Sequence, residues 1–463
     1  MNRIGPAKII AGIAFGICAL LLIAPPQNMP VPLAHVAALT VFSIGFWATG
    51  AWPEHVTAVA FFVGAMLLGV ASPTVVFSGF ASSALWLVFA GLVFGVAIKR
   101  TGLGERLARS LVGRIGHSYA AVIAGVVAVA IVLAFLMPSS MGRVVLFIPI
   151  VSALADALGF EAHSRGRTGM VMAAGLSCFI PGAAILPAAV PNLVLIGAAE
   201  TQFQMHFAYL DYLLLQFPVI GLLGGGLIVG LTCLFYYEPP RAMDLPSQQP
   251  PMTAPERRLA MILAGALVLW VTDFVHGISP AWIGLGASLL CLLPRSDLVP
   301  PKVFGEQVNF GPMLYVAGIL GMAAVIADSG LGELVGDYFL AWAPLAPGAD
   351  AGNFAALVGI SALTGLITTM AGVPAILTPF ADNLSAATGM SLYAVIMTQV
   401  MGYATLFVPY ESPPLVVAMQ LGGVRVAQAL RLTVTNAMLF LIVLLPINFL
   451  WWLWLGMFSV PTG

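Results

Sequence analysis

Charged side chains are scarce in this sequence. Asp, Glu, Lys and Arg make up 8% of the 463 residues, whereas 60% of the residues are hydrophobic. A soluble globular protein carries about 25% charged residues, because polar side chains must cover its core. The composition therefore excludes a soluble domain and indicates that lipid surrounds most of the chain. The net charge of −1 also excludes the basic field that binds nucleic acid.

Cysteine is rare as well, and its placement argues against disulfides and metal sites. The four cysteines, each within an apolar stretch, are Cys18, Cys178, Cys233 and Cys291. A thiol in such a stretch acts as a small packing residue. The sequence also lacks a nucleotide-binding loop, a nucleophile triad motif and an HExxH motif. We therefore expect neither an enzyme nor an ATP-driven pump.

Long apolar runs fill most of the remaining chain. A helix needs about 20 apolar residues to cross the hydrocarbon core. The eleven predicted spans are 8–25, 33–50, 56–72, 83–100, 168–199, 211–237, 259–276, 280–294, 311–328, 391–422 and 432–456. Two further stretches, 119–160 and 353–390, are broken near the middle, and we expect each to form a re-entrant hairpin. The predicted fold class is an all-α integral membrane protein.

Lysine and arginine are missing from every segment that we predict to lie outside. The segments around 26–32, 73–82, 200–210 and 329–352 contain neither residue. With a cytoplasmic N-terminus, all but one of the 17 basic residues lie inside, and the exception is Arg143 in the first broken stretch. This pattern predicts a multi-pass protein of the inner (cytoplasmic) membrane, with its N-terminus in the cytoplasm and its C-terminus outside.

The chain is predicted to consist of two inverted halves. Thr101–Glu105 reads TGLGE, and Ser329–Glu333 reads SGLGE 228 residues later. The sequence ILPAAVPNLV from Ile185 aligns with FVPYESPPLV from Phe407 at an offset of 222. The first TGLGE falls on the cytoplasmic side and its counterpart on the outer side, so the halves are inverted, as in many secondary transporters.

A proline-rich segment lies between the halves. Its six prolines prevent a continuous helix, so we predict that it is a linker. We predict a scaffold part with an arm at 1–118, a transport part at 119–237, the cytoplasmic linker at 238–257, a second scaffold part with its arm at 258–352, and a second transport part at 353–463.

Four helix interruptions, in two matched pairs, mark the expected site. The polar breaks at 138–143 and 368–374 contain small hydroxyl residues and glycine, which let the chain turn and offer free amides to an anion. The proline breaks at 187–192 and 409–414 free carbonyls that bind a cation. For any single break, the alternative is a simple kink. The symmetric recurrence favours a substrate site near the bilayer midplane.

Two charged residues stand out within these breaks. Arg143 lies deep in apolar sequence, where an arginine costs about 3 kcal/mol unless it is paired or faces water. It is the leading predicted anion ligand, since a guanidinium grips a carboxylate or sulfate by two parallel hydrogen bonds. A structural ion pair is the alternative. Glu411 has three interpretations, as a proton carrier, a cation ligand or the partner of Arg143.

These motifs resemble those of the divalent anion/sodium symporter family of the ion transporter superfamily. The resemblance rests on the run from Trp86 through VFAGLVFGVAIKRTGLGERLA, the hairpin segment ending in LFIP, and the VPN and SPP breaks. It covers about 34–450 and implies a homodimer that works by an elevator-like movement around one anion and its coupling cations. Hairpin tips of the family typically carry Ser-Asn-Thr, whereas this chain has Ser-Ser-Met at 139–141 and Thr-Met-Ala at 369–371.

Together, the residues and the resemblance give the following candidate sites. The candidate substrate-binding residues are Ser139, Ser140, Met141, Gly142, Arg143, Pro191, Asn192, Thr369, Met370, Ala371, Gly372, Val373, Ser412 and Pro413. The candidate coupling-ion residues are Ser139, Asn192, Thr369 and Glu411.

We therefore expect a secondary active transporter of a small anion of the di- or tricarboxylate, sulfonate or sulfate class. Its expected partners are that anion, Na⁺ or H⁺, the lipid bilayer and a second copy of the chain, with no nucleic acid and no cofactor beyond a bound Na⁺. The alternatives are a cation/proton antiporter or an arsenite-like oxyanion efflux protein of the same superfamily. A membrane receptor or enzyme is a third class, which the lack of a polar cluster and of a sensor domain disfavours.

Overall fold

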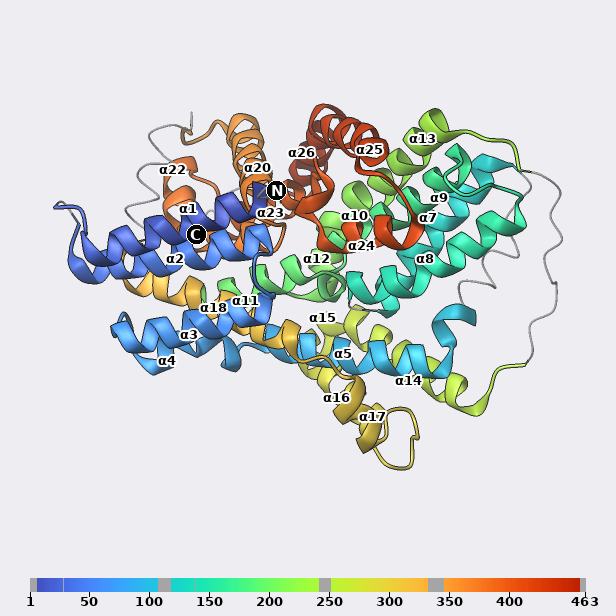
Figure 1. Cartoon of the computed structure of the whole chain (residues 1–463), viewed down its shortest axis with the longest axis horizontal. Coiled ribbons are helices and arrows are strands. Elements are labelled where there is room, and N and C mark those ends of the chain that lie inside the picture. Colours follow the sequence, from blue (N-terminus) through green and yellow to red (C-terminus); the bar gives the residue numbers. More distant parts are fainter. Residues whose placement is uncertain are drawn as a thin grey trace, which may run out of the picture.

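The computed structural model describes residues 6–27, 29–106, 118–137, 139–240, 251–331 and 345–458, and the regular elements in these ranges are all helices (Figure 1). The helices of the first half are α1 (Pro6–Ile23), α2 (Val31–Thr49), α3 (Glu54–Leu68), α4 (Pro73–Val76), α5 (Ser83–Thr101), α7 (Tyr119–Leu136), α8 (Ser140–Ala157), α9 (Arg165–Ser177), α10 (Ile180–Ala183), α11 (Val190–Phe203), α12 (Tyr209–Gln216) and α13 (Gly224–Tyr236). The predicted all-α fold class is thereby confirmed.

The second half continues the all-helical pattern after the linker. Its helices are α14 (Ala254–Val271), α15 (Asp273–His276), α16 (Pro280–Leu292), α17 (Pro301–Gln307), α18 (Gly311–Asp328), α20 (Asp350–Ile367), α21 (Gly372–Leu377), α22 (Ala381–Thr388), α23 (Leu392–Ala404), α24 (Pro413–Gly422), α25 (Val426–Leu439) and α26 (Leu445–Trp454). Of the described helices, 8 are long and apolar enough to cross a membrane, or 9 if one bent pair forms a single span. Other predicted crossings are shorter or broken helices, such as α3, α16 and α24.

The breaks in the helices lie where the sequence predicts them. In the first half, α7 ends at Leu136 and α8 begins at Ser140, while in the second half α20 ends at Ile367 and α21 begins at Gly372. The second pair of breaks precedes α11 and α24, and both helices have proline in their first turn, where the missing N–H is not needed. The described residues leave out 138, 107–117, 241–250 and 332–344, and the predicted arms after TGLGE and SGLGE fall largely in the second and fourth of these ranges.

Each half contains a π-helical turn, and the two turns are at matching positions. The helix formed by α12 and α13 contains one at Phe217–Leu223, and the helix formed by α25 and α26 contains one at Phe440–Leu444. Their starting positions are 223 residues apart, close to the offset of the proline breaks. A π turn inserts one extra residue into a helix and is rare, so its recurrence at this spacing supports a duplicated architecture.

The helices form two bands that run across the molecule (Figure 1). The lower band contains α3, α5, α14 and α16, in which α5 packs against α16, and α3 packs against α18. The upper band contains α7, α8, α9, α13, α25 and α26, in which α9 packs against α7, α8 and α13. The same band contains α20 of the second hairpin and α24, which follows the second proline break, so hairpin and broken-helix segments from both halves share it (Figure 1).

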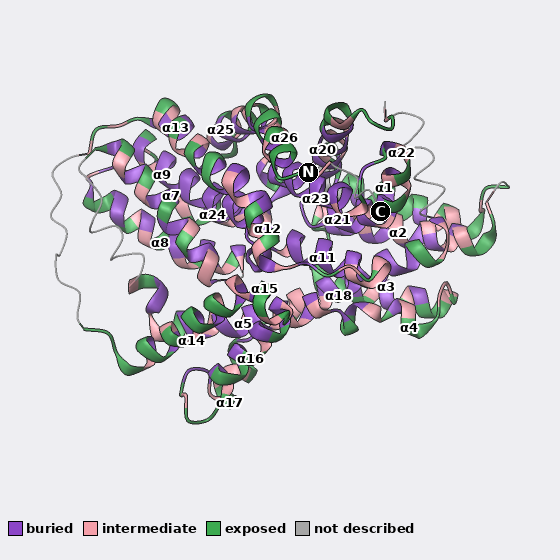
Figure 2. Cartoon of the chain, turned by 180° about the vertical axis from the view of Figure 1, so that it is seen from behind, coloured by how far each residue is buried: buried purple, intermediate pink, exposed green. Residues whose placement is uncertain are grey.

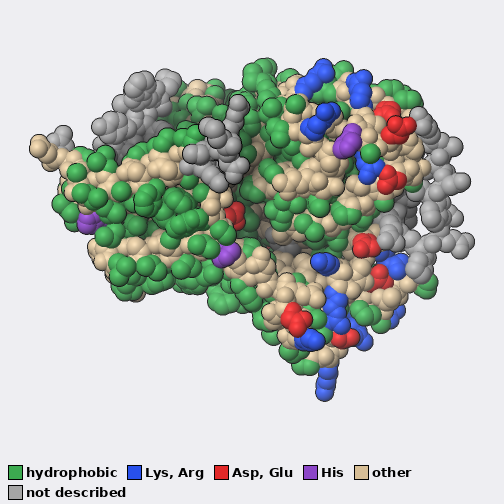
Figure 3. Space-filling view, in the orientation of Figure 1, with side chains coloured by type: hydrophobic (Ala, Val, Ile, Leu, Met, Phe, Trp, Pro, Cys, Tyr) green, Lys and Arg blue, Asp and Glu red, His purple; other side chains and the backbone are tan. Residues whose placement is uncertain are grey.

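Burial follows the expectation for a protein surrounded by lipid. Helices α9 and α23 are buried along almost their whole length, and α11 and α18 along most of theirs (Figure 2). By contrast, α1 exposes large apolar side chains, among them Ile13 at 57% and Leu20 at 62%. The surface over α1, α2 and α3 is largely hydrophobic, and the visible Lys and Arg side chains gather over the other side of the molecule (Figure 3).

Candidate functional site

A cavity of about 530 Å³ lies where the two hairpin tips and the two proline breaks meet. Small-molecule sites typically measure about 300–1,000 Å³. The predicted site residues that line it are Ser139, Ser140, Met141, Pro191, Thr369, Met370, Ala371, Glu411, Ser412 and Pro413. Segments more than 200 residues apart in the sequence thus share one wall of the cavity.

The first hairpin tip is held in place by its own serines. Ser139 is the N-cap of α8, and its hydroxyl accepts a hydrogen bond from the N–H of Gly142 at 3.1 Å. The hydroxyl of Ser140 donates to the carbonyl of Ala188 at 3.3 Å, which ties the tip to the first proline break. Met141 projects from the tip and is 37% exposed.

The second tip is tied to its break by the backbone instead. The N–H of Met370 donates to the carbonyl of Glu411 at 3.1 Å. The hydroxyl of Thr368 bonds to the carbonyl of Thr364 in its own helix at 2.9 Å. Each tip therefore forms one hydrogen bond with the proline break of its own half.

Five described helices of ten or more residues begin at the cavity, namely α3, α8, α11, α18 and α24. A helix carries about half a positive charge at its N-terminus, which favours an anion there. Ser412 belongs to the cavity lining, and its hydroxyl is buried without a hydrogen-bond partner among the described residues. The cavity therefore offers helix N-termini to an anion, and the wall around it contains a hydroxyl without a partner among the described residues.

The structure places Arg143 away from the cavity. Arg143 is fully buried behind the first tip and does not line the cavity. Its Nη1 donates to the carbonyl of Met137, and its Nη2 donates to the carbonyl of Cys178 at 2.6 Å and to the hydroxyl of Ser140 at 3.0 Å. No described carboxylate bonds to it, so the predicted ion pair and the predicted partnership with Glu411 are also absent.

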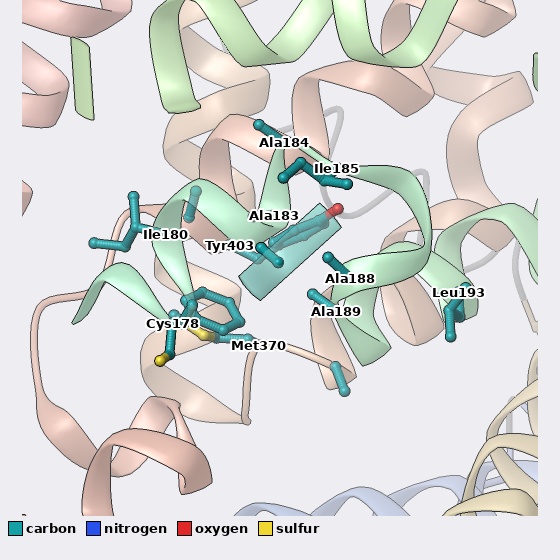
Figure 4. Packing of buried hydrophobic residues seen from close by; sticks show 14 of the residues in the cluster. Cys178, Ile180, Ala183, Ala184, Ile185, Ala188, Ala189, Leu193, Met370 and Tyr403 are labelled. Atoms are coloured by element: carbon teal, nitrogen blue, oxygen red, sulfur yellow. The ribbon is translucent and has the colours of Figure 1, made fainter. Parts of the chain in front are cut away.

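Asn192 is likewise turned away from the cavity. Its Nδ2 donates to the carbonyl of Ile185 at 2.9 Å, and its Oδ1 accepts the hydroxyl of Tyr403 at 2.7 Å. Tyr403 and Met370 of the second half lie among the first-half residues Cys178 to Ala189 (Figure 4). Asn192 thus joins the cores of the two halves. Three other predicted residues, Gly142, Gly372 and Val373, also lie outside the cavity lining.

Glu411 lines the cavity but is only 1% exposed. Its Oε1 accepts the backbone N–H groups of Phe407 at 3.1 Å and Val408 at 2.8 Å. These bonds fold the carboxylate back over its own break. Its Oε2 points toward α20, since a Cβ built on Gly365 would lie 3.4 Å from that oxygen.

The opposite wall of the cavity was missed by the sequence analysis. It includes Glu54, His55, Asn309 and Tyr315, from the start of α3 and from the start of α18 and the residues just before it. A polar run at the end of an apolar span, such as Trp52–His55, is the only signal that could have indicated it. None of the described residues that line the cavity is Lys or Arg.

A second cavity, of about 570 Å³, lies on the other side of Leu193, which lines both cavities. It is bordered by the start of α5, by the segment 205–208 and by the segment 277–282. In the predicted topology these segments are at the outer side, whereas the loop at 50–55 of the first cavity is cytoplasmic. The hydroxyl of Ser83 and the carboxylate of Glu200, 2.5 Å apart, hold this outer wall together.

Comparisons with known proteins agree with this architecture. The sodium:sulfate symporter transmembrane region family matches residues 6–458. A protein of Cupriavidus necator described as a membrane protein is 23% identical over 96% of this chain and 93% of its own length. The L-tartrate/succinate antiporter of Escherichia coli K12 is 25% identical over 81% of this chain and 79% of its own length.

A solved structure shares the fold. The Alcanivorax borkumensis YdaH transporter, whose structure is described as having an unusual topology, superposes with a TM-score of 0.60 at 17% identity over 93% of this chain and 100% of that one. The family match spans nearly the whole chain, so the predicted family is confirmed. The chain is a membrane transporter, not an enzyme, and it belongs to the sodium:sulfate symporter family, the divalent anion/sodium symporters.

Proposed function

We propose that this protein is a secondary active transporter of a small organic dicarboxylate, coupled to the movement of Na⁺ or H⁺. The observation that carries the proposal is the cavity at which both hairpin tips, both proline breaks and five helix N-termini meet. The likeness to the L-tartrate/succinate antiporter supports a C4 dicarboxylate over an inorganic oxyanion.

In this proposal the helix ends and the hydroxyls bind the substrate carboxylates. The described lining contains Glu54 and Glu411 but no Lys or Arg to neutralise a dianion. A dianion beside two carboxylates is repelled, unless a cation or proton binds with it. Glu411 is the ionisable group nearest to the tips and breaks, so we assign the coupling step to this residue.

Movement is proposed to follow the elevator mode. Each tip is hydrogen-bonded to its own break, and the bond from Tyr403 to Asn192 joins α23 of the second half to the first proline break. These elements can therefore travel as one body with the substrate. Leu193, which separates the two cavities, would then pass the face of α5, so that the site opens to each side in turn.

The protein in proteoliposomes tests the proposal directly. Uptake of labelled succinate, L-tartrate and sulfate is measured with an Na⁺ gradient, with a pH gradient, or with internal succinate alone. We expect uptake of succinate or tartrate under at least one of these driving forces. If none of the three anions is transported while Na⁺/H⁺ exchange or arsenite efflux occurs, the alternative function within the superfamily replaces this one.

A pair of variants tests whether the substrate binds in the cavity. Ser412→Ala removes the buried hydroxyl that has no partner among the described residues, so it should weaken substrate binding by about 1.5–3 kcal/mol, the value of a hydrogen bond to a charged group. Thr435→Ala is the matched control, because Thr435 lies outside the cavity lining and its hydroxyl bonds to the carbonyl of Arg431 in its own helix. If both variants bind the substrate with equal affinity, the substrate does not contact the second break.

Membrane orientation is proposed from the charge pattern and is testable separately. Single cysteines at Gln249 and at Gly348 should react with a membrane-impermeant thiol reagent from opposite sides, Gln249 from the cytoplasm. Labelling of both positions from one side would overturn the inverted arrangement of the halves.

A further inference from the structure

Arg143 holds an unusual position for a buried charge, because its bonding partners are all neutral. We propose that its guanidinium is a tethered cation that permanently fills a cation site in the first half. The second half then contains the only exchangeable coupling site, beside Glu411. This inference rests on the proposed function. It adds that one coupling site is used for each transported substrate.

The oxygen atoms that accept hydrogen bonds from the guanidinium are of the kind expected around a bound cation. They are the carbonyl of Met137 after the last residue of α7, the carbonyl of Cys178 after the last residue of α9, and the hydroxyl of Ser140. The C-terminal end of a helix carries a partial negative charge. Carbonyls at such ends bind Na⁺ or H⁺-linked groups in transporters with broken helices. Here a side chain of the protein occupies that place.

The site is closed around the guanidinium. Arg143 is 0% exposed, and its Nε is buried without a partner among the described residues. A Cβ built on Gly182 would lie 2.6 Å from Nη2, so only glycine lets the guanidinium approach Cys178. An arginine that bound solvent or substrate would need an open path, which this packing does not leave.

The second half has no charge at the position equivalent to Arg143, and its acid stands at a different position. The offset that aligns Ser139 with Thr369 aligns Arg143 with Val373, which is buried and apolar. The offset that aligns the proline breaks places Glu411 opposite Ala189 of the first half.

Val373 and Glu411 are close in space. A Cβ built on Gly365 would lie 3.6 Å from Cγ2 of Val373 and 3.4 Å from Oε2 of Glu411. The first half therefore has a cation without an acid, and the second half has an acid without a cation. An acid without an internal cation must take its cation or proton from solution, whereas the first half needs none.

The test measures Na⁺ binding without substrate or transport, so its failure is distinct from failure of the proposed function. The full chain in detergent is titrated with NaCl against choline chloride at constant ionic strength, and the melting temperature is recorded. A ligand that binds the folded state raises this temperature. In Glu411→Gln, with the first site filled by Arg143, we expect no Na⁺-dependent rise.

The double variant Arg143→Gly with Glu411→Gln empties the first site. We expect Na⁺ to raise its melting temperature, and methylguanidinium to do so as well, because each can occupy the vacated carbonyls. Arg143→Met in the same background is the matched control, since its side chain fills the space without a charge and should abolish the response to both ions. A double variant that responds to neither ion would overturn the proposal.

A milder variant covers the case in which Arg143→Gly does not fold. Gly182→Ala with Glu411→Gln keeps the arginine but pushes its guanidinium away from Cys178. A Na⁺-dependent rise in its melting temperature supports the tethered cation, and the lack of any rise in the folded variant contradicts it.

Discussion

The two halves of this protein share their backbone plan but differ in the chemistry placed on it. Both have a hairpin tip hydrogen-bonded to a proline break and both have a π turn at the equivalent position. The first half adds Arg143 behind its tip, whereas the second adds Glu411 in its break. The shared plan builds the cavity, and the side chains that break the symmetry are those expected to decide coupling.

The largest effect is expected from Glu411, the acid that only the second half has. Glu411→Gln should abolish uphill accumulation of substrate in proteoliposomes while sparing exchange of external for internal substrate, because exchange moves no net coupling ion. Uptake against a gradient and counterflow are measured on the same vesicles.

Glu161→Gln serves as the control for a lost carboxylate, since Glu161 is exposed in the loop between α8 and α9. Suppose that wild-type uptake follows an Na⁺ gradient and ignores a pH gradient, and that Glu411→Gln leaves this uptake intact. The coupling ion would then be Na⁺ bound elsewhere, and the comparison between the halves would lose its functional meaning.

Much of the shared plan could be predicted from the sequence. The span at 311–328 coincides with α18, and both hairpins turn within the predicted polar breaks. The reason is physical, because the length of an apolar run fixes a crossing, and proline and glycine fix its interruptions. The offsets between repeated motifs also indicated which breaks would meet.

The direction of individual side chains could not be predicted in this way. Arg143 was expected in the cavity, yet its acceptors at Met137 and Cys178 come from the ends of two other helices. Glu54 and Asn309 line the far wall through contacts between segments about 250 residues apart. A sequence pattern gives the face of a helix, whereas the partners opposite that face depend on tertiary packing.

The bond between the halves gives the next largest effect, on stability. Tyr403→Phe removes the hydroxyl that bonds to Oδ1 of Asn192 and leaves this buried oxygen without that donor. An unsatisfied buried polar group costs about 1–3 kcal/mol. We expect a lower melting temperature in detergent. Tyr410→Phe removes the bond from an exposed hydroxyl to the carbonyl of Leu366 and should change it less, because Tyr410 is 51% exposed and water can replace that bond. Equal shifts would mean that the two halves are joined mainly by apolar packing.

The two tips should differ in their sensitivity to a side-chain change. Ser140→Ala removes both the bond to Ala188 and one acceptor of Arg143, and should weaken substrate affinity by about 1 kcal/mol. Met370→Ala leaves the backbone bond to Glu411 in place and should cost less affinity. Calorimetric titration of both variants with succinate makes the comparison. A larger loss for Met370→Ala would show that side-chain packing, not the bond to the break, positions the second tip.

The smallest effect is expected at a carboxylate that stays charged, in contrast to Glu411. Arg106, after α5 of the first half, donates to Glu256 of α14 in the second half at 2.8 Å. This bond lowers the pKa of Glu256 from 4.5 to about 2. Because the pKa is lower in the folded protein, the pair stabilises the fold fully above about pH 4.5, and this contribution is lost as the pH falls toward 2.

Glu256→Gln tests this difference between a fixed and a coupling carboxylate. The variant should have a slightly lower melting temperature than the wild type at neutral pH. This difference in melting temperature should become smaller only below about pH 4.5. Substrate accumulation should be unchanged, since a group that keeps its charge across the physiological range carries no proton through the cycle. If this difference in melting temperature disappears near neutral pH, or if the variant loses substrate accumulation, then Glu256 changes its protonation state in the physiological range and the Arg106–Glu256 contact takes part in coupling.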